Sequence, residues 1–154
     1  MSINKVQNTH IEEVLPELLQ ALVDIVNVMN SPERDAELLE KAGLTLERAL
    51  FPLLVLVDRL GPIGIGDLAD KVLRDYTTVS RQVARLEELG LATRRLSKAD
   101  RRVREVTITP LGKVAADAVD MARRQMAVDM FRDWARSDFD DLTRLLKMLA
   151  ATMR

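Results

Sequence analysis

Hydrogen-bonding side chains recur at helical spacing in one segment of the chain, Tyr76 to Leu89. Its apolar residues fall three or four positions apart, which leaves one polar helix face. This face consists of Thr77, Thr78, Arg81, Gln82 and Arg85. Arginine offers forked donors that fit guanine, glutamine pairs with adenine, and threonine offers a hydroxyl or a methyl group. The first four residues predict contacts with DNA base edges, and Arg85, one turn further, better suits a phosphate. The alternative is a merely solvated helix face.

A second group of charged residues lies in the polar stretch from Ser97 to Arg104. The flanking segments, Leu91 to Leu96 and Glu105 to Thr109, have strand character, so the pattern predicts a β-hairpin with a charged tip. The charged residues of the stretch are Lys98, Asp100, Arg101, Arg102 and Arg104. Such a tip can reach phosphates or a narrow, strongly negative minor groove, unless it is only a soluble surface loop.

The net charge of the 154-residue chain, −1, conceals a segregation of charge. Residues 71–104 hold ten basic and four acidic residues, a net of +6, whereas the other 120 residues hold 13 basic and 20 acidic ones, a net of −7. The acidic remainder would repel DNA and favour one orientation of approach. The segregation therefore favours a single nucleic-acid-binding face.

Other chemistry is not indicated. The absence of cysteine excludes disulfides, thiol catalysis and cysteine-ligated metal, and the single histidine, His10, argues against a histidine-based metal site. The acidic cluster at 138–141 lacks the spacing of a calcium loop and is better explained by helix capping. No catalytic triad, phosphate loop or dinucleotide fingerprint occurs. We expect no enzyme activity, no metal and no cofactor.

Nothing in the sequence indicates a membrane protein. The first 20 residues contain no apolar stretch of signal-peptide length. The longest apolar run, Leu53 to Val57, is too short to cross a bilayer. We expect a cytosolic protein without a membrane partner.

The first half of the chain predicts helices that are separated by proline and glycine residues. An amphipathic helix is expected over residues 11–29, with Pro16 near its start, and a short one over residues 35–41. Thr45 is expected to cap a helix over residues 46–60, in which Pro52 causes a kink or delays the start. A small helix over residues 67–73 then precedes the segment capped by Asp75.

Two helices are expected at the end of the chain. Thr109-Pro110 opens a helix of about 25 residues, about 37 Å long, and Ser137 caps the last one. Together with the hairpin, this order predicts a mostly α protein with a small β-hairpin wing, a winged helix-turn-helix.

The sequence resembles the MarR family of bacterial transcription regulators over nearly its whole length. The segment from Asp100 to Thr109, followed by Pro110-Leu111-Gly112, is similar to that family's wing signature. The helix-turn-helix pattern is matched by Leu68-Ala69, Thr78-Val79-Ser80-Arg81, Arg85-Leu86-Glu87 and Leu89-Gly90-Leu91. The resemblance implies that Arg102 enters the minor groove, braced by a salt bridge to Asp100, while the helix from Tyr76 reads the major groove.

Three positions depart from the family pattern. Leu73 stands where many members have glycine, Arg74 where an apolar residue is usual, and Gly64 where serine or threonine usually caps a helix. Leu73 and Arg74 imply a wider or differently packed turn before the helix from Tyr76, and Gly64 leaves only a backbone group to cap the preceding helix.

The apolar stripes of residues 11–29, 111–134 and 142–153 are too wide for one small winged helix to cover. We expect a homodimer on a palindromic operator, with a monomeric bundle as the alternative. The expected division is residues 1–42 and 110–154 for dimerisation and residues 43–109 for the DNA-binding lobe.

By resemblance, a phenolic or anionic effector would bind in a crevice near the first helix, the helix around Phe51 and the start of the long helix. The expected function is a regulator, most often a repressor in such families, that binds double-stranded DNA. The rival from another class is a protein-interaction module whose basic face binds an acidic partner.

Overall fold

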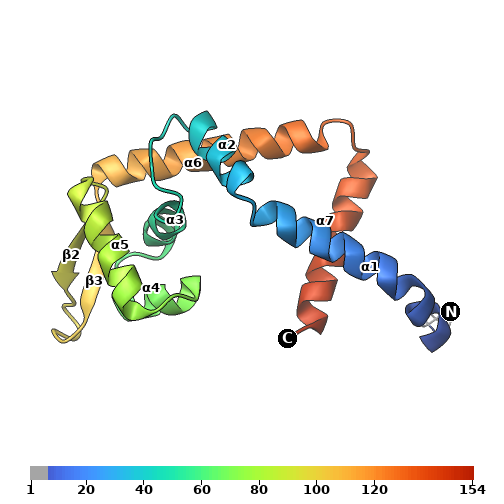
Figure 1. The fold of residues 1–154 in the computed structure, drawn as a ribbon, viewed down its shortest axis with the longest axis horizontal. Coiled ribbons are helices and arrows are strands. Elements are labelled where there is room, and N and C mark those ends of the chain that lie inside the picture. Colours follow the sequence, from blue (N-terminus) through green and yellow to red (C-terminus); the bar gives the residue numbers. More distant parts are fainter. Residues whose placement is uncertain (1–6) are drawn as a thin grey trace. The chain divides into compact units, whose positions relative to one another are not determined.

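A computed structural model describes residues 7–154 of the chain (Figure 1). Its contacts divide the chain into two compact units, residues 1–37 and residues 38–154. In the described part no helix is long and apolar enough to span a membrane. The elements are α1 (Asn8–Met29), α2 (Pro32–Lys41), α3 (Phe51–Leu60), β1 (Ile63–Gly64), α4 (Ile65–Val72), α5 (Tyr76–Glu88), β2 (Ala92–Leu96), β3 (Arg104–Ile108), α6 (Pro110–Phe131) and α7 (Arg136–Thr152).

The first unit consists of α1 and the beginning of α2. The expected position of Pro16 near the start of a helix is wrong, because α1 begins at Asn8 and Pro16 lies inside it. α2 begins at Pro32 rather than at Asp35, since the hydroxyl of Ser31 accepts a hydrogen bond from the backbone N–H of Arg34 at 3.2 Å and supports the first turn.

In the second unit, α3 begins five residues later than the expected start at Leu46. Pro52 lies in its first turn, the part of a helix where a missing N–H and a fixed φ are tolerated. The alternative of a delayed start is therefore confirmed, and the cap expected at Thr45 is wrong. The buried core around α3 joins α3, α4, α5, β3 and the start of α6. Its fully buried members include Leu53, Leu54, Val57, Leu68, Val79, Val83, Leu86 and Val106.

The hairpin belongs to a three-stranded antiparallel sheet of order β1-β3-β2. The expected hairpin is confirmed, with Arg94 opposite Val106 and Leu96 opposite Arg104. The short strand β1 was not expected. It pairs Ile63 with Val106, and two residues are too few for a recognisable alternation.

α4 and α5 form the helix-turn-helix, and α4 packs against both α3 and α5. α4 ends with Leu73 in the left-handed conformation, at φ 55° and ψ 43°. The N–H of Leu73 bonds to the carbonyl of Asp70, and the N–H of Arg74 bonds to that of Ala69. This is the hydrogen-bond pattern of a Schellman motif, with leucine where glycine is usual. Leucine at position 73 therefore preserves a standard helix end, and its left-handed backbone conformation costs free energy that glycine would not.

α6 starts inside the core of the winged lobe. The hydroxyl of Thr109 accepts from the N–H of Gly112 at 2.9 Å and donates to the carbonyl of Gly90 at 2.6 Å, so Thr109 caps the helix that the sequence predicts to open at Thr109-Pro110. Gly112 is packed so closely that a Cβ atom there would overlap the carbonyl oxygen of Leu91. α6 has 22 residues rather than about 25, which is about 33 Å.

The cap expected at Ser137 is wrong. α7 begins at Arg136, so Ser137 lies within its first turn, and the residue at the cap position is Ala135, which has no side-chain cap. The corner between α6 and α7 is instead built from aromatic rings. Phe131 contacts Trp134 and Phe139 edge to face, at centroid distances of 5.1 and 4.8 Å.

Candidate nucleic-acid interface

The start of α5 is fixed by Asp75, as the sequence predicts. Its Oδ1 accepts from the backbone N–H of Thr78 at 2.8 Å, and its Oδ2 accepts from the Thr78 hydroxyl at 2.6 Å. These two bonds, the side-chain one foremost, hold the pKa of the Asp75 carboxyl below its ordinary value. The hydroxyl proton of Thr78 is thus used within the protein, which leaves its methyl group and oxygen lone pairs for a partner.

α5 buries one face and exposes the other. Val79, Val83 and Leu86 are completely buried, so the opposite side of the helix faces away from the core. That side brings together the five polar residues singled out in the sequence. Of these, Thr77, Arg81 and Arg85 are exposed, and Thr78 and Gln82 are half-buried.

The five side chains differ in how far they are free to bind a partner. Within residues 7–154, the guanidinium of Arg81 has neither an ion pair nor a hydrogen bond, so its donor fork is available. Gln82 is bonded: its Oε1 accepts from Nη1 of Arg74 at 2.9 Å. The same Nη1 donates to the carbonyl of Ala49 at 2.8 Å.

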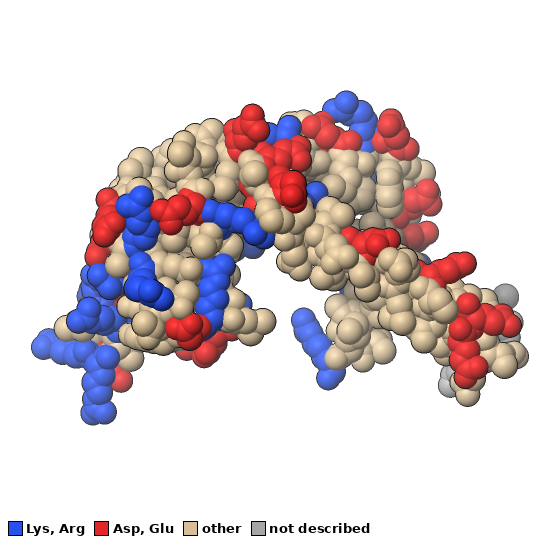
Figure 2. All heavy atoms as spheres, in the orientation of Figure 1, with Lys and Arg blue, Asp and Glu red and all other residues tan. Residues whose placement is uncertain are grey.

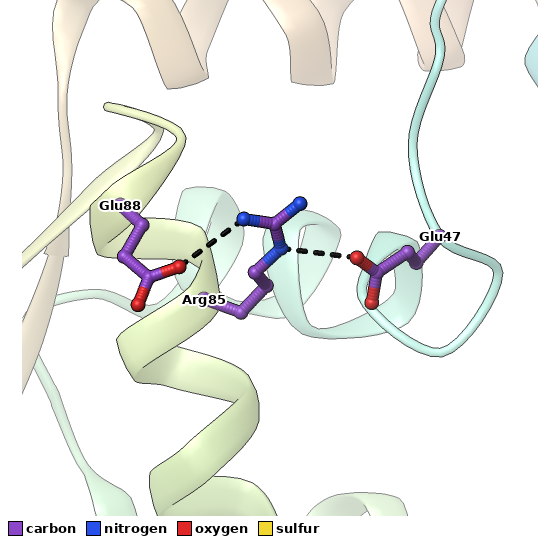
Figure 3. A network of polar contacts seen from close by, with 3 residues as sticks. All are labelled: Glu47, Arg85 and Glu88. Carbon is purple, nitrogen blue, oxygen red and sulfur yellow. Dashed lines mark hydrogen bonds and ion pairs between the residues drawn. The ribbon is translucent and has the colours of Figure 1, made fainter.

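Arg85 lies between two carboxylates (Figure 3). Its Nε donates to Glu47 at 3.0 Å and its Nη1 to Glu88 at 3.1 Å. Both carboxylates raise the pKa of the guanidinium, with the Glu47 hydrogen bond as the largest cause. Arg85 therefore joins α5 to the segment before α3, and a phosphate would have to compete with two glutamates for it.

The cations of the wing fall into two groups. Arg94 pairs with Glu87 at 3.2 Å, and Arg95 lies 3.9 Å from Glu105, so these arginines are used within the lobe. The other group projects from the turn of the β2–β3 hairpin, where Figure 2 shows basic side chains gathered. It consists of Lys98, Arg101, Arg102 and Arg104, all exposed and without an ion pair in the described part of the chain.

Hydrogen bonds from backbone N–H groups to side-chain oxygens hold the tip of the wing. The hydroxyl of the buried Ser97 accepts from the N–H groups of Ala99 and Asp100 at 3.2 and 3.3 Å. Asp100 Oδ1 accepts from the backbone N–H of Arg102 at 3.0 Å. Among the described residues, no ion pair joins Asp100 to the Arg102 guanidinium, so the salt bridge implied by the resemblance is wrong. Asp100 shapes the turn and leaves the arginine side chain free.

A cavity of about 400 Å³ lies beside α3, on the side of the helix-turn-helix. Its wall combines apolar residues with four cationic side chains and includes no carboxylate. The lining residues are Phe51, Pro52, Val55, Leu56, Arg59, Lys71, Val72, Arg74 and Arg123.

A second cavity of about 310 Å³, between α3 and the start of α6, is more polar. Lys113 lies there between Asp58 and Asp117, both at 3.1 Å. The two carboxylates raise its pKa. Both cavities adjoin the helix around Phe51, where a crevice is expected. Among the described residues no group of histidine, aspartate and glutamate could hold a metal ion.

A recognition helix placed after a tight turn and followed by a basic hairpin defines a winged helix-turn-helix protein. The family model "MarR family" matches residues 46–103. The HTH-type transcriptional regulator YxaD of Bacillus subtilis (strain 168), itself uncharacterized, is 34% identical over 110 residues, which are 71% of this chain and 77% of that protein. The chain belongs to the MarR family and is a transcriptional regulator, not an enzyme.

Solved structures agree on the fold. A MarR family protein from Bacillus stearothermophilus has a TM-score of 0.76 at 19% identity, with 96% of this chain and 99% of that chain covered. The transcriptional regulator BldR from Sulfolobus solfataricus has a TM-score of 0.67 at 21% identity, with 95% and 99% covered. The expected fold class, mostly α with a small wing, is confirmed.

Sequence reasoning missed the residues that restrain the binding face. Glu47 and Ala49 lie 38 and 25 positions before their partners Arg85 and Arg74, so no local pattern connects them. Of these residues, only Arg74 could be noticed in the sequence, because it is charged at a position where the family pattern has an apolar residue. The structure explains it as a link between the segment before α3 and Gln82 on α5.

Proposed function

We propose that this regulator is a repressor that binds a palindromic operator as a homodimer and is released by a small anionic ligand. The observation that carries DNA recognition is the combination of the free guanidinium of Arg81 on α5 with the unpaired cations of the wing tip in the same compact unit. One basic helix face is common on protein surfaces. An unpaired arginine on α5 together with unpaired cations at the tip of the adjoining hairpin is expected of a surface that meets phosphates and bases.

The roles divide by groove. Thr77, Thr78, Arg81 and Gln82 contact base edges in the major groove, and Arg81 pairs with guanine through its fork. Arg102 enters the minor groove. Lys98, Arg101 and Arg104 bind phosphates, Asp100 shapes the tip, and Arg85 reaches a phosphate only after release from its glutamates.

Each unit supports dimerisation through apolar surface that the chain leaves uncovered. All 22 residues of α1 are described and none is buried, and ten of its large apolar side chains are 39–65% exposed. α7 likewise buries none of its residues and exposes Leu145 and Leu146 at 45% each. Exposed apolar stripes of this extent are typical of oligomer interfaces. We assign residues 1–42 and 110–154 to a two-fold dimer, which sets the operator half-sites about one helical turn apart.

The 400 Å³ cavity supports release by an anionic ligand. Its cationic side chains, Arg59, Lys71, Arg74 and Arg123, favour a carboxylate or phenolate, and the ring of Phe51 offers an apolar wall for an aromatic body. A ligand there touches residues of α3, α4 and the turn before α5, so its binding can bias the position of the recognition helix.

The test begins with selection of bound duplexes from a random pool, followed by fluorescence anisotropy at several salt concentrations. We expect an inverted repeat and a steep loss of affinity with salt, at a log-log slope near −0.9 per neutralised phosphate. Arg81→Ala should relax the preference at one base pair and cost about 1–3 kcal/mol. Arg102→Ala should weaken binding and flatten the slope.

The control is Arg136→Ala, since Arg136 lies at the start of α7 with its side chain 96% exposed, and its loss removes the same charge away from the proposed face. Absence of binding to any duplex at low salt would refute the proposal. If the protein then bound acidic peptides in the same assay, the basic face would serve protein interaction instead. Release from operator by small phenolic acids, tested in the same titration, checks the ligand.

A further inference from the structure

Arg74 occupies the turn of the helix-turn-helix, at a position where its side chain contacts the proposed reading face. The Schellman end of α4 fixes its backbone, and the guanidinium extends to two acceptors on different segments. One is the carbonyl of Ala49, at 2.8 Å, and the other is Oε1 of Gln82, at 2.9 Å. Both bonds come from Nη1, which has two hydrogens, so this nitrogen is fully used.

The contact determines how the Gln82 amide is turned. A guanidinium only donates hydrogen bonds, so the group that faces Arg74 must be the carbonyl oxygen and not the NH₂ group. The Nε2 donors of Gln82 therefore point away from Arg74. The guanidinium of Arg74 is itself anchored to Ala49, which lies outside the helix, so the amide is oriented by a fixed partner.

We propose that Arg74 is a positioning residue that makes Gln82 a hydrogen-bond donor toward DNA, so that Gln82 favours guanine over adenine. Pairing of glutamine with adenine requires its oxygen to accept from the adenine N6 amine while its nitrogen donates to N7. In this protein the oxygen is bonded to a cation, and that cation also repels the amine. On its major-groove edge, guanine presents two acceptors, N7 and O6, to the Nε2 donors of Gln82. The inference rests on the proposed DNA binding and reverses the adenine preference expected from the residue type alone.

The first test uses the full-length protein and locates the base pair that Gln82 reads. Gln82→Ala is compared with the wild type in duplex selection, and the position at which only the variant loses its preference is the contact. We expect guanine there in the wild type, favoured over adenine at least about fivefold in affinity. A preference for adenine at that position, or no change at any position, would overturn the inference.

The second test removes the positioning contact. Arg74→Leu supplies the apolar residue usual in the family and frees Oε1, so the preference at the same base pair should move from guanine toward adenine. A merely structural role would weaken all duplexes equally and leave the preference unchanged, which would also overturn the inference. Thermal unfolding of Arg74→Leu shows whether the variant is folded; if it is not, Gln82→Glu replaces it, and loss of the guanine preference is expected because a carboxylate has no donor.

The matched control is Arg136→Leu. Arg136 lies at the start of α7 with its side chain 96% exposed, and the structure gives it no bond to Gln82. This variant loses the same charge and should keep the guanine preference. A shift as large as that of Arg74→Leu would mean that general charge, not the contact, sets the preference, and would refute the proposal. Failure of the wild type to bind any duplex would instead refute the proposed function itself.

Discussion

Replacement of Leu73 by glycine should stabilise the protein. Leu73 adopts φ 55° and ψ 43°, the left-handed conformation, and its side chain is 92% exposed. A residue with a Cβ pays about 1–2 kcal/mol for this conformation, and glycine does not. Glycine loses about 0.5–1 kcal/mol more backbone entropy on folding. Because the leucine side chain buries almost nothing, the net gain for Leu73→Gly is about 0.5–1 kcal/mol.

Thermal unfolding at one fixed protein concentration measures this gain, since the stability of an oligomer depends on concentration. A gain of this size corresponds to a rise in Tm of about 1–4 °C for a chain of this length. Leu73→Ala is the matched control: alanine also removes the exposed side chain but retains the Cβ, so its Tm should stay near that of the wild type. Equal Tm values for the glycine and alanine variants would show that the turn stores no backbone strain, and the reasoning would be wrong.

Three further changes test other contacts. Gly112→Ala should destabilise the lobe by more than about 3 kcal/mol in urea unfolding, because the added methyl group overlaps a backbone carbonyl. Glu87 has a pKa held below its ordinary value, 4.5, first by the backbone N–H of Arg94, so the stability advantage of wild type over Glu87→Gln should be complete at pH 7 and be lost as the pH falls from 4.5 through the lowered pKa. Glu47→Gln combined with Glu88→Gln should free Arg85 and steepen the salt dependence of DNA binding; an unchanged slope would mean that Arg85 does not reach a phosphate.

The elements could be predicted wherever a local signal specifies them. Asp75 and Thr109 cap α5 and α6 because their side chains bond to a backbone N–H three residues later, a pattern visible in the sequence. Ser137 is also of a residue type that favours helix caps, but it lies inside α7, where the tertiary contact of Phe131 with Phe139 spans the corner. β1 could not be predicted, since its pairing with β3 depends on residues more than 40 positions away.

The features of the candidate site also divide into those that local sequence specifies and those that depend on tertiary folding. Helical spacing was enough to place Thr77, Arg81 and Gln82 on one face of α5, because a helix is a local structure. It could not show which of these side chains were already bonded. That information depends on Arg74 and on the segment before α3, which reach the face through tertiary folding.

Pairing within the protein also limits what the basic segment can contribute to DNA binding. Of the arginines in residues 71–104, Arg85, Arg94 and Arg95 lie within 4 Å of a glutamate, so their charge is already compensated. The wing tip keeps its four cations unpaired in the described part of the chain, and a proposed dimer would present eight. Of these, Lys98, Arg101 and Arg104 are proposed to bind phosphates, and the resulting six contacts in a dimer give a log-log salt slope of about −5. A slope steeper than these cations and Arg81 account for would mean that DNA displaces glutamates from the paired arginines, so the salt slope tests whether the protein's own ion pairs open on binding.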